Sequence, residues 1–140
     1  MNYWLIKSEP SAYSWQQLKK DKKTDWTGVR NYAARNNLRD MKNGDLALYY
    51  HSNEGLAMVG IARVVKPAYQ DPTTDNPAWL SVDFEPLMDI PKPVSLEQAK
   101  NDAILKNMDL VRLQRLSVGK VTEKEFKRVC ELGGVDFNRL

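Results

Sequence analysis

The order of apolar and polar residues changes period several times along the chain, and each period predicts one kind of element. Residues 3–6 are a run of aromatic and aliphatic side chains that predicts a buried strand, and Pro10 prevents sheet pairing soon after it. Three further segments are rich in residues that favour strands: 46–50, 56–65 and 79–87. The polar stretch 51–55 suits a hairpin between the first two, and the proline-containing stretch 66–78 predicts a loop.

Helical spacing predicts two helices in the first half of the chain. Ser14 is the expected N-cap of a short helix that runs to about Lys20. Residues 31–41 place their apolar side chains three and four positions apart, which predicts a second helix. Asn43 and Gly44 then supply a stop and a tight turn.

Capping residues predict two more helices in the second half. Ser95 and Thr122 each precede a Gln or Glu by three residues, which is the capping-box pattern. In the helix after Thr122, one face carries Phe126, Val129 and Cys130. Cys130 is therefore expected to be a small buried hydrophobic residue rather than a reactive thiol.

These elements together predict an α+β fold. The expected helices are short and do not alternate regularly with the strands, so a doubly wound α/β fold is not expected. A small curved sheet or open barrel with helices packed on its rim fits the order of elements. No repeat, low-complexity tract or Gly/Ser linker interrupts the chain, and we expect a single domain over residues 1–140.

The scarcity of cysteine and histidine excludes two kinds of stabilising site. With one Cys and one His, the chain forms neither an internal disulfide nor a His/Cys zinc site, and we expect no metal and no cofactor. The N-terminus places only about five largely apolar residues before a charge, far fewer than a signal sequence or a membrane span needs. We therefore expect a soluble, cytoplasmic, monomeric protein without a membrane partner.

Basic residues concentrate in the first half of the chain. Residues 1–70 hold 11 Lys and Arg against 6 Asp and Glu, whereas residues 71–140 hold 10 against 12. The basic residues of the first half form two groups: Lys19, Lys20, Lys22 and Lys23, and Arg30, Arg35, Arg39 and Lys42. Such groups attract the phosphates of nucleic acid, although two solvated helix faces are the simpler explanation.

No catalytic motif stands out. The chain has no GxGxxG, no P-loop and no HExxH. His51 and Ser52 are adjacent at the end of an expected strand, so their side chains project to opposite faces and cannot form a nucleophile–base pair. Lys7, Ser8 and Glu9 have groups suited to acid–base catalysis, but they too are consecutive. We assign no catalytic residue and expect that the protein is not an enzyme.

Trp26 differs from the other tryptophans because it lies in a polar loop, residues 24–31. A large apolar ring in a loop either fills the core or lines a pocket, and composition alone favours the core. Thr27, Arg30 and Asn31 favour the pocket, because their donors and acceptors can read the edge of a planar base stacked on the indole. Both interpretations are open.

Several segments, in order over about residues 2–130, together resemble the EVE domain. The matching stretches are YWLIKSEP at 3–10, WTGVRN at 26–31, ARN at 34–36, MKNGD at 41–45, YYHS at 49–52, GIA at 60–62, DPT at 71–73, Trp79, VD at 82–83 and RLSV at 115–118. The EVE domain belongs to the PUA-like group, which also contains the YTH readers of methylated adenine. The chain is similar to its short, single-domain bacterial form.

The resemblance implies a PUA-like open β-barrel of about five to six strands flanked by short helices. It also implies binding of DNA or RNA that carries a modified base, without catalysis. In such readers the base is flipped into a pocket with aromatic walls, and hydrogen bonds read its edge. Trp26 is the implied stacking wall, and Tyr69 or Trp79 is the nearest candidate for a second wall.

The residues that the resemblance places at the pocket come from four stretches of the chain. The implied base-binding residues are Lys7, Ser8, Trp26, Thr27, Gly28, Val29, Arg30, Asn31, Tyr50, His51, Ser52, Leu116, Ser117 and Val118. Arg35 and Arg115 are implied phosphate contacts.

Two other functions are kept beside this one. The first is a hydrolase of the related ASCH-like branch, which cleaves an acylated nucleoside or an amide with Lys7 and a carboxylate. Turnover of acetylated cytidine that depends on Lys7 would favour it. The second is a protein-binding adaptor that has the fold without the pocket chemistry, and failure to bind any nucleic acid at any salt concentration would favour that.

Overall fold

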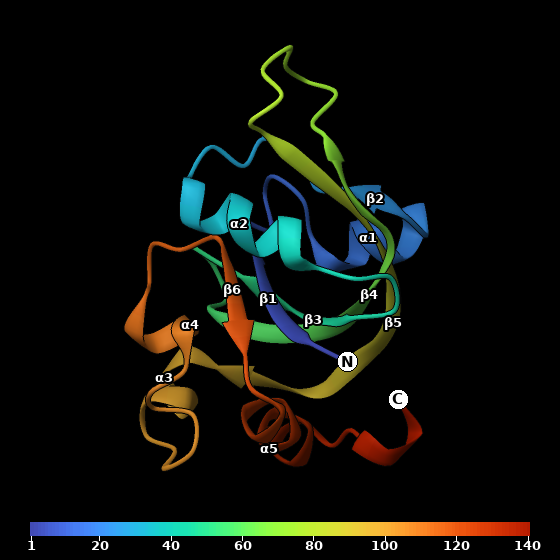
Figure 1. Ribbon diagram of the computed structural model, residues 1–140. Coiled ribbons are helices and arrows are strands. Elements are labelled where there is room, and N and C mark those ends of the chain that lie inside the picture. The colour runs from blue at the N-terminus through green and yellow to red at the C-terminus, as the bar shows by residue number, and fades with distance from the viewer.

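Six strands form one curved mixed sheet in the computed structural model, which describes residues 1–140 (Figure 1). The strands are β1 Tyr3–Ser8, β2 Thr24–Asp25, β3 Leu46–His51, β4 Ala57–Gln70, β5 Leu80–Ser95 and β6 Val118–Val121. Their order in the sheet is β2-β5-β4-β3-β1-β6. β1 runs parallel to β3, and every other neighbouring pair is antiparallel. The α+β class and the curved sheet predicted from the sequence are confirmed.

Short helices pack against this sheet. They are α1 Trp15–Asp21, α2 Tyr32–Asp40, α3 Leu96–Lys100, α4 Asp109–Arg112, α5 Glu123–Gly133 and the 3-10 helix η1 Phe137–Arg139. Figure 1 shows α1 and α2 in the upper half of the molecule and α3, α4 and α5 in the lower half. No helix is long and apolar enough to cross a membrane.

The caps predicted from the sequence hold the helix ends. The Ser14 hydroxyl accepts a hydrogen bond from the Gln17 N–H at the start of α1. Thr122 and Glu125 form a complete capping box at the start of α5, where each side chain accepts from the other residue's backbone. Because such caps satisfy backbone groups that the helix itself leaves free, they set where each helix begins.

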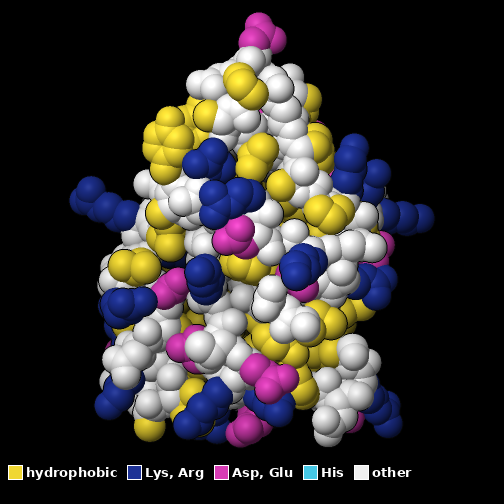
Figure 2. Space-filling view, viewed as in Figure 1, with side chains coloured by type: hydrophobic (Ala, Val, Ile, Leu, Met, Phe, Trp, Pro, Cys, Tyr) yellow, Lys and Arg dark blue, Asp and Glu magenta, His cyan; other side chains and the backbone are white.

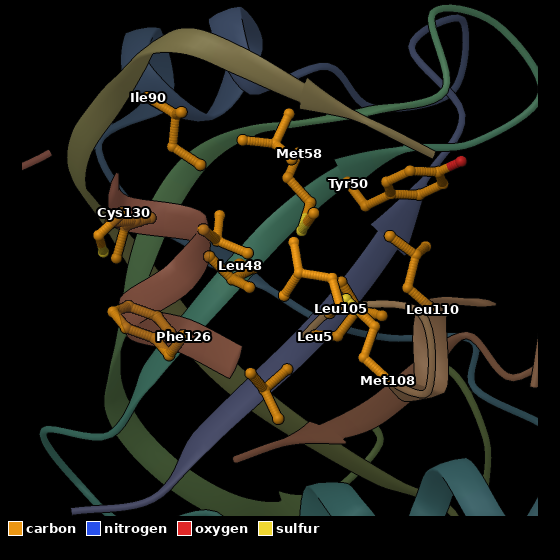
Figure 3. Packing of buried hydrophobic residues seen from close by; sticks show 14 of the residues in the cluster. Leu5, Leu48, Tyr50, Met58, Ile90, Leu105, Met108, Leu110, Phe126 and Cys130 are labelled. Carbon is orange, nitrogen blue, oxygen red and sulfur yellow. The ribbon is translucent and has the colours of Figure 1, made fainter. Parts of the chain in front are cut away.

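The alternation of side chains along the strands divides the core into two clusters. Trp4 and Ile6 of β1 point to the face that α1 and α2 cover. Leu5 points to the other face, where it joins Tyr50 of β3 in the cluster covered by α3, α4 and α5 (Figure 3). Cys130 of α5 belongs to this second cluster, and burial raises the pKa of its thiol to about 11, which confirms it as a buried hydrophobic residue.

The central hairpin of β4 and β5 is longer than the sequence predicts. Residues 66–70, predicted to be loop, belong to β4, and β5 continues to Ser95 beyond the predicted end at residue 87. Proline was one reason for predicting a loop at 66–78, and both added segments contain it, as Pro67 in β4 and as Pro91 and Pro93 in β5. The strands accommodate them because the pairing register shifts at several points, where ladder hydrogen bonds are missing anyway.

Four short elements were not predicted: β2, which lies at the start of the expected loop 24–31, and α4, β6 and η1. β6 is an edge strand that pairs antiparallel with β1 and places Gly119 opposite Leu5. β6 has only four residues, too few for a strand to be recognised from the alternation of apolar and polar side chains. It forms a strand because one edge of β1 is free to pair with it.

Candidate functional site

A pocket of about 510 Å³ lies where the end of β1 meets the loop between β2 and α2. It is lined by Lys7, Ser8, Tyr13, Thr24, Asp25, Trp26, Thr27, Gly28, Val29, Arg30 and Ser117. Eight of these are residues that the resemblance implies, and Tyr13, Thr24 and Asp25 are additions from the structure. A second pocket of about 560 Å³ near Tyr3 and Glu123 contains no predicted site residue.

Trp26 belongs to the core and to the pocket at once. The residue is only 8% exposed, and its ring packs edge-on against Tyr49 and Phe84, with centroids 5.6 and 5.8 Å away. It also lines the pocket. The two interpretations of the sequence, core filling and pocket lining, therefore describe two sides of one residue.

The indole N–H groups of the buried tryptophans differ in their partners. Trp4 donates to Asp45 at 3.0 Å, and Trp15 donates to Asp89 at 2.7 Å. The indole N–H of Trp26 has no acceptor within the protein, although every side-chain nitrogen and oxygen that is sealed from solvent has a partner. This N–H group therefore reaches solvent, where a ligand acceptor can satisfy it.

The pocket loop leaves the sheet through a turn at Gly28. The Trp26 N–H donates to the Val82 carbonyl at 2.8 Å and extends the pairing of β2 with β5. Gly28 then adopts φ +80°, a left-handed conformation that favours glycine. A Cβ there would meet no atom within 4 Å, so backbone conformation rather than space accounts for the glycine.

Asp71 holds this loop from the far side. Its buried carboxylate accepts hydrogen bonds from the Gly28 N–H at 2.8 Å and the Arg30 guanidinium at 2.9 Å. The backbone N–H and hydroxyl of Thr73 donate to it at 2.7 and 2.6 Å. Burial by itself raises the pKa of Asp71, but these hydrogen bonds outweigh burial and hold the pKa well below its usual range. The ionised carboxylate thus couples the pocket loop to the turn between β4 and β5.

The end of β1 contributes Lys7 and Ser8, and the Lys7 N–H donates to the Ser117 carbonyl at 3.0 Å. The Lys7 ammonium donates to the Gln114 carbonyl at 3.0 Å and lies 6.0 Å from the centroid of the Tyr50 ring. Burial lowers the pKa of Lys7, partly offset by the charge of Asp109. The ammonium is therefore anchored to a backbone carbonyl, and no carboxylate forms an ion pair with it.

The order of these segments is matched by a known family. The model of the EVE domain matches residues 2–132. The chain belongs to the EVE family. Its six-stranded mixed sheet with short helices is the PUA-like fold of that family.

Relatives of this EVE domain are found in animals and bacteria. Thymocyte nuclear protein 1 of Gallus gallus is 38% identical, over 93% of this chain and 68% of its own length. A solved structure from Agrobacterium tumefaciens is 48% identical, with a TM-score of 0.94 and 96% and 94% of the two chains covered. Human THYN1, crystallised in complex with DNA containing 5-methylcytosine, is 34% identical, with a TM-score of 0.88 and 97% and 99% covered.

Three implied residues of the EVE domain lie at the end of β3 or just after it, beside Ser8, but do not line the pocket. Tyr50 is 3% exposed and packs in the cluster on the α5 face (Figure 3). His51 accepts a hydrogen bond from the Trp15 N–H through Nε2 at 3.0 Å, and burial lowers its pKa. The Ser52 N–H donates to the Ser8 carbonyl at 3.0 Å. In this structure Tyr50, His51 and Ser52 support the strand ends that carry the pocket.

The remaining implied residues lie around the pocket of the EVE domain. Asn31 and Leu116 line a neighbouring pocket of about 390 Å³ together with Arg115. Val118 is fully buried in β6. Arg35 lies on α2 and forms no ion pair with a carboxylate.

Neither candidate for a second aromatic wall lines the EVE pocket. The Tyr69 hydroxyl donates to Asp83 on the central hairpin. Trp79 stacks on Tyr32 with a centroid distance of 4.9 Å. The pocket in this structure therefore has one tryptophan, Trp26, and otherwise mostly polar lining.

Proposed function

We propose that this EVE domain binds nucleic acid that carries a modified base, and that the modified base enters the pocket at the end of β1. The observation that supports this most directly is the indole N–H of Trp26, which lacks a protein acceptor, is not sealed from solvent and belongs to a residue that lines the polar pocket. The edge of a nucleobase presents ring nitrogens and carbonyl oxygens that accept such a donor. Because the human relative was crystallised with 5-methylcytosine DNA, methylated cytosine is the first ligand to test.

Hydrogen bonds are expected to contribute more to base binding than stacking on Trp26. Extrusion of a base costs a few kcal/mol, and less where the base is already unpaired. Only 8% of Trp26 is exposed, too little for a full stacking face. The hydroxyl groups of Ser8 and Thr27 and the guanidinium of Arg30, whose side chain is 40% exposed, offer the further polar contacts that base and phosphate require.

Binding is proposed to occur without catalysis. A hydrolase of the ASCH-like branch needs a nucleophile or base within hydrogen-bond reach of its activating partner. Lys7 instead donates to the Gln114 carbonyl and has no carboxylate partner. Turnover of acetylated cytidine that disappears in the variant Lys7→Ala would overturn this part of the proposal.

The binding function is tested with fluorescence anisotropy. Single-stranded DNA oligonucleotides that differ only in the methyl group of one cytosine are titrated with wild-type protein and with Trp26→Phe. This variant keeps an aromatic ring in the core but lacks the indole N–H. Wild-type protein is expected to bind the methylated strand more tightly, and Trp26→Phe is expected to lose most of that preference.

Trp4→Phe is the matched control, because it removes an indole N–H that is already bonded to Asp45. It is expected to lower stability and leave the preference for methylated DNA intact. If the methylated strand is not preferred, nucleic acid that copurifies with the protein is digested to nucleosides for mass spectrometry. Enrichment of another modified nucleoside identifies the base, and equal binding of every modified and plain strand refutes the function.

A further inference from the structure

Four side chains beside the pocket form a stacked row in the order Arg30, Trp79, Tyr32 and Arg35, which we call the aromatic row. The Arg30 guanidinium lies 5.6 Å from the centroid of the Trp79 ring. The Trp79 and Tyr32 rings are 4.9 Å apart and inclined by 33°. The Arg35 guanidinium lies 5.2 Å from the centroid of the Tyr32 ring. Each of the two aromatic rings thus has one guanidinium group near it, and 59% of Tyr32 is still exposed.

Tyr32 remains exposed within this row. It is the first residue of α2 and is 59% exposed, and the other large exposed hydrophobic residues of the protein are all aliphatic. A solitary exposed hydrophobic residue is common on protein surfaces. Tyr32 is different because its ring lies beside the Arg35 guanidinium and the Trp79 ring, and much of its surface is available to a ligand.

The charges of the row favour an anionic partner. Arg35 donates to the Ala78 carbonyl and to the Asn36 side chain, so no carboxylate neutralises its guanidinium. Arg30 is paired with Asp71 but keeps 40% of its side chain exposed. Aromatic faces combined with guanidinium groups are the chemistry with which proteins bind single-stranded nucleic acid.

The aromatic row is continuous with the pocket. Arg30 lines the pocket and also contacts Trp79, so the row begins at the rim of the pocket. Figure 2 shows hydrophobic and basic side chains side by side on the upper part of this face, over α2 and the loop between β4 and β5. A strand with one base in the pocket therefore has its neighbouring nucleotides close to this surface.

We infer that Tyr32 is a stacking platform for the base next to the modified one, beside the phosphate contact that the resemblance already implies for Arg35; this inference rests on the proposed function. The partner is a single-stranded segment of nucleic acid, because the base of a paired nucleotide has both faces covered by its neighbours. Recognition by Tyr32 does not depend on the modification, since every base offers a flat face.

A thermodynamic cycle tests the contact. Single-stranded DNA that carries an abasic site on one side or the other of the methylated cytosine is compared with intact DNA, using wild-type protein and Tyr32→Ala. Loss of the neighbouring base on one side is expected to weaken wild-type binding by about 5- to 150-fold. Tyr32→Ala is expected to weaken binding of intact DNA by a similar factor and to show no further loss with the abasic strand.

Two control variants separate stacking from other effects. Tyr32→Phe keeps the ring and is expected to bind like wild type, whereas Met88→Ala removes an exposed apolar side chain on β5 and is expected to change nothing. Because Tyr32 is exposed, thermal melting of Tyr32→Ala is expected to resemble that of wild type. Equal losses in wild type and Tyr32→Ala for both abasic strands overturn the inference.

The same cycle distinguishes failure of this inference from failure of the proposed function. It is repeated with unmethylated strands, in which the contact with Tyr32 is expected to persist. If no modified base is preferred, the proposed function is refuted. The coupling between Tyr32 and the neighbouring base, which is the difference between the losses that the abasic site causes in wild type and in Tyr32→Ala, can still be measured. Absence of coupling at both neighbouring positions refutes only the stacking platform.

Discussion

The Nε2 atom of His51 accepts a 3.0 Å hydrogen bond from the backbone N–H of Trp15, the first residue of α1. An imidazole accepts through one nitrogen only when it is neutral, with its proton on Nδ1. Burial lowers the pKa of His51, which favours the same neutral state. The single histidine of the chain thus joins the end of β3 to the first turn of α1.

The stability of the protein is therefore expected to decrease in mild acid. The unfolded chain binds a proton at His51 near its usual pKa of about 6.5, whereas the folded protein binds it only at lower pH. The stabilisation is complete above the unfolded pKa and is lost as the pH falls toward the lowered folded pKa. Urea unfolding of wild type and His51→Gln between about pH 8 and pH 5 measures this loss, and NMR titration of the imidazole gives the pKa directly. A folded pKa at or above the unfolded value contradicts the prediction.

Asp71 is expected to matter for both stability and base recognition. Asp71→Ala leaves the Gly28 N–H, Thr73 and Arg30 without their shared acceptor, which is expected to cost about 2–4 kcal/mol. The pocket loop then loses its tie to the β4–β5 turn, and the preference for a modified base is expected to fall. Chemical denaturation and anisotropy titrations measure the two effects. Thr73→Ala is the milder control, because it removes only one of the side-chain donors to Asp71. If Asp71→Ala folds and still prefers the modified base as strongly as wild type, the pocket loop keeps its shape without Asp71 and the prediction is wrong.

Two glycines are expected to respond to alanine for different reasons. Gly28→Ala places a side chain at φ +80° without any clash, and is expected to cost about 1–2 kcal/mol. A methyl group on Gly60 in β4 meets the Trp15 ring, so Gly60→Ala is expected to cost about 1–3 kcal/mol or more through overpacking. Denaturation curves rank the two, and binding is expected to change more in Gly28→Ala, because only Gly28 lines the pocket. The reverse ranking in binding contradicts this assignment.

The salt dependence of binding is expected to be weaker than the basic first half suggests. Ion pairs join Lys19 to Asp89 and Arg30 to Asp71, so acidic residues of the second half neutralise part of that charge. Arg35 has no such partner. Arg35→Gln is expected to reduce the slope of log affinity against log salt by about 0.7 for single-stranded DNA. Arg39→Gln is the control, because Arg39 is paired with Asp40, and an unchanged slope in Arg35→Gln excludes a phosphate contact.

Elements that depend on local interactions could be predicted from the sequence. α1 and α5 begin where Ser14 and Thr122 cap them, because a capping side chain bonds to backbone only a few positions away. β6 and the outer part of the β4–β5 hairpin could not be predicted. Their pairing depends on a free edge of β1 and on register shifts that tolerate proline, and both are properties of the assembled sheet.

The same division holds for the site. The sequence by itself determined that Trp26, Gly28 and Arg30 share one polar loop, and its resemblance to the EVE domain placed that loop at a pocket with Ser117. Strand alternation places Tyr49 and Tyr50 on opposite faces of the sheet. Only the assembled fold decided which face lies toward the pocket: Tyr49 packs against Trp26, whereas Tyr50 lies in the other cluster.

Tertiary structure also decided how the loop is held and how its charge is balanced. Asp71 is 41 positions from Arg30 in the chain, and although it begins the DPT stretch shared with the EVE domain, nothing in that stretch indicates Arg30 as its partner. Folding brings Asp71 under the loop, where burial strengthens its hydrogen bonds and its charge offsets that of Arg30. The sequence thus determined which groups the loop contains, whereas the assembled fold decided which of them remain free for a ligand.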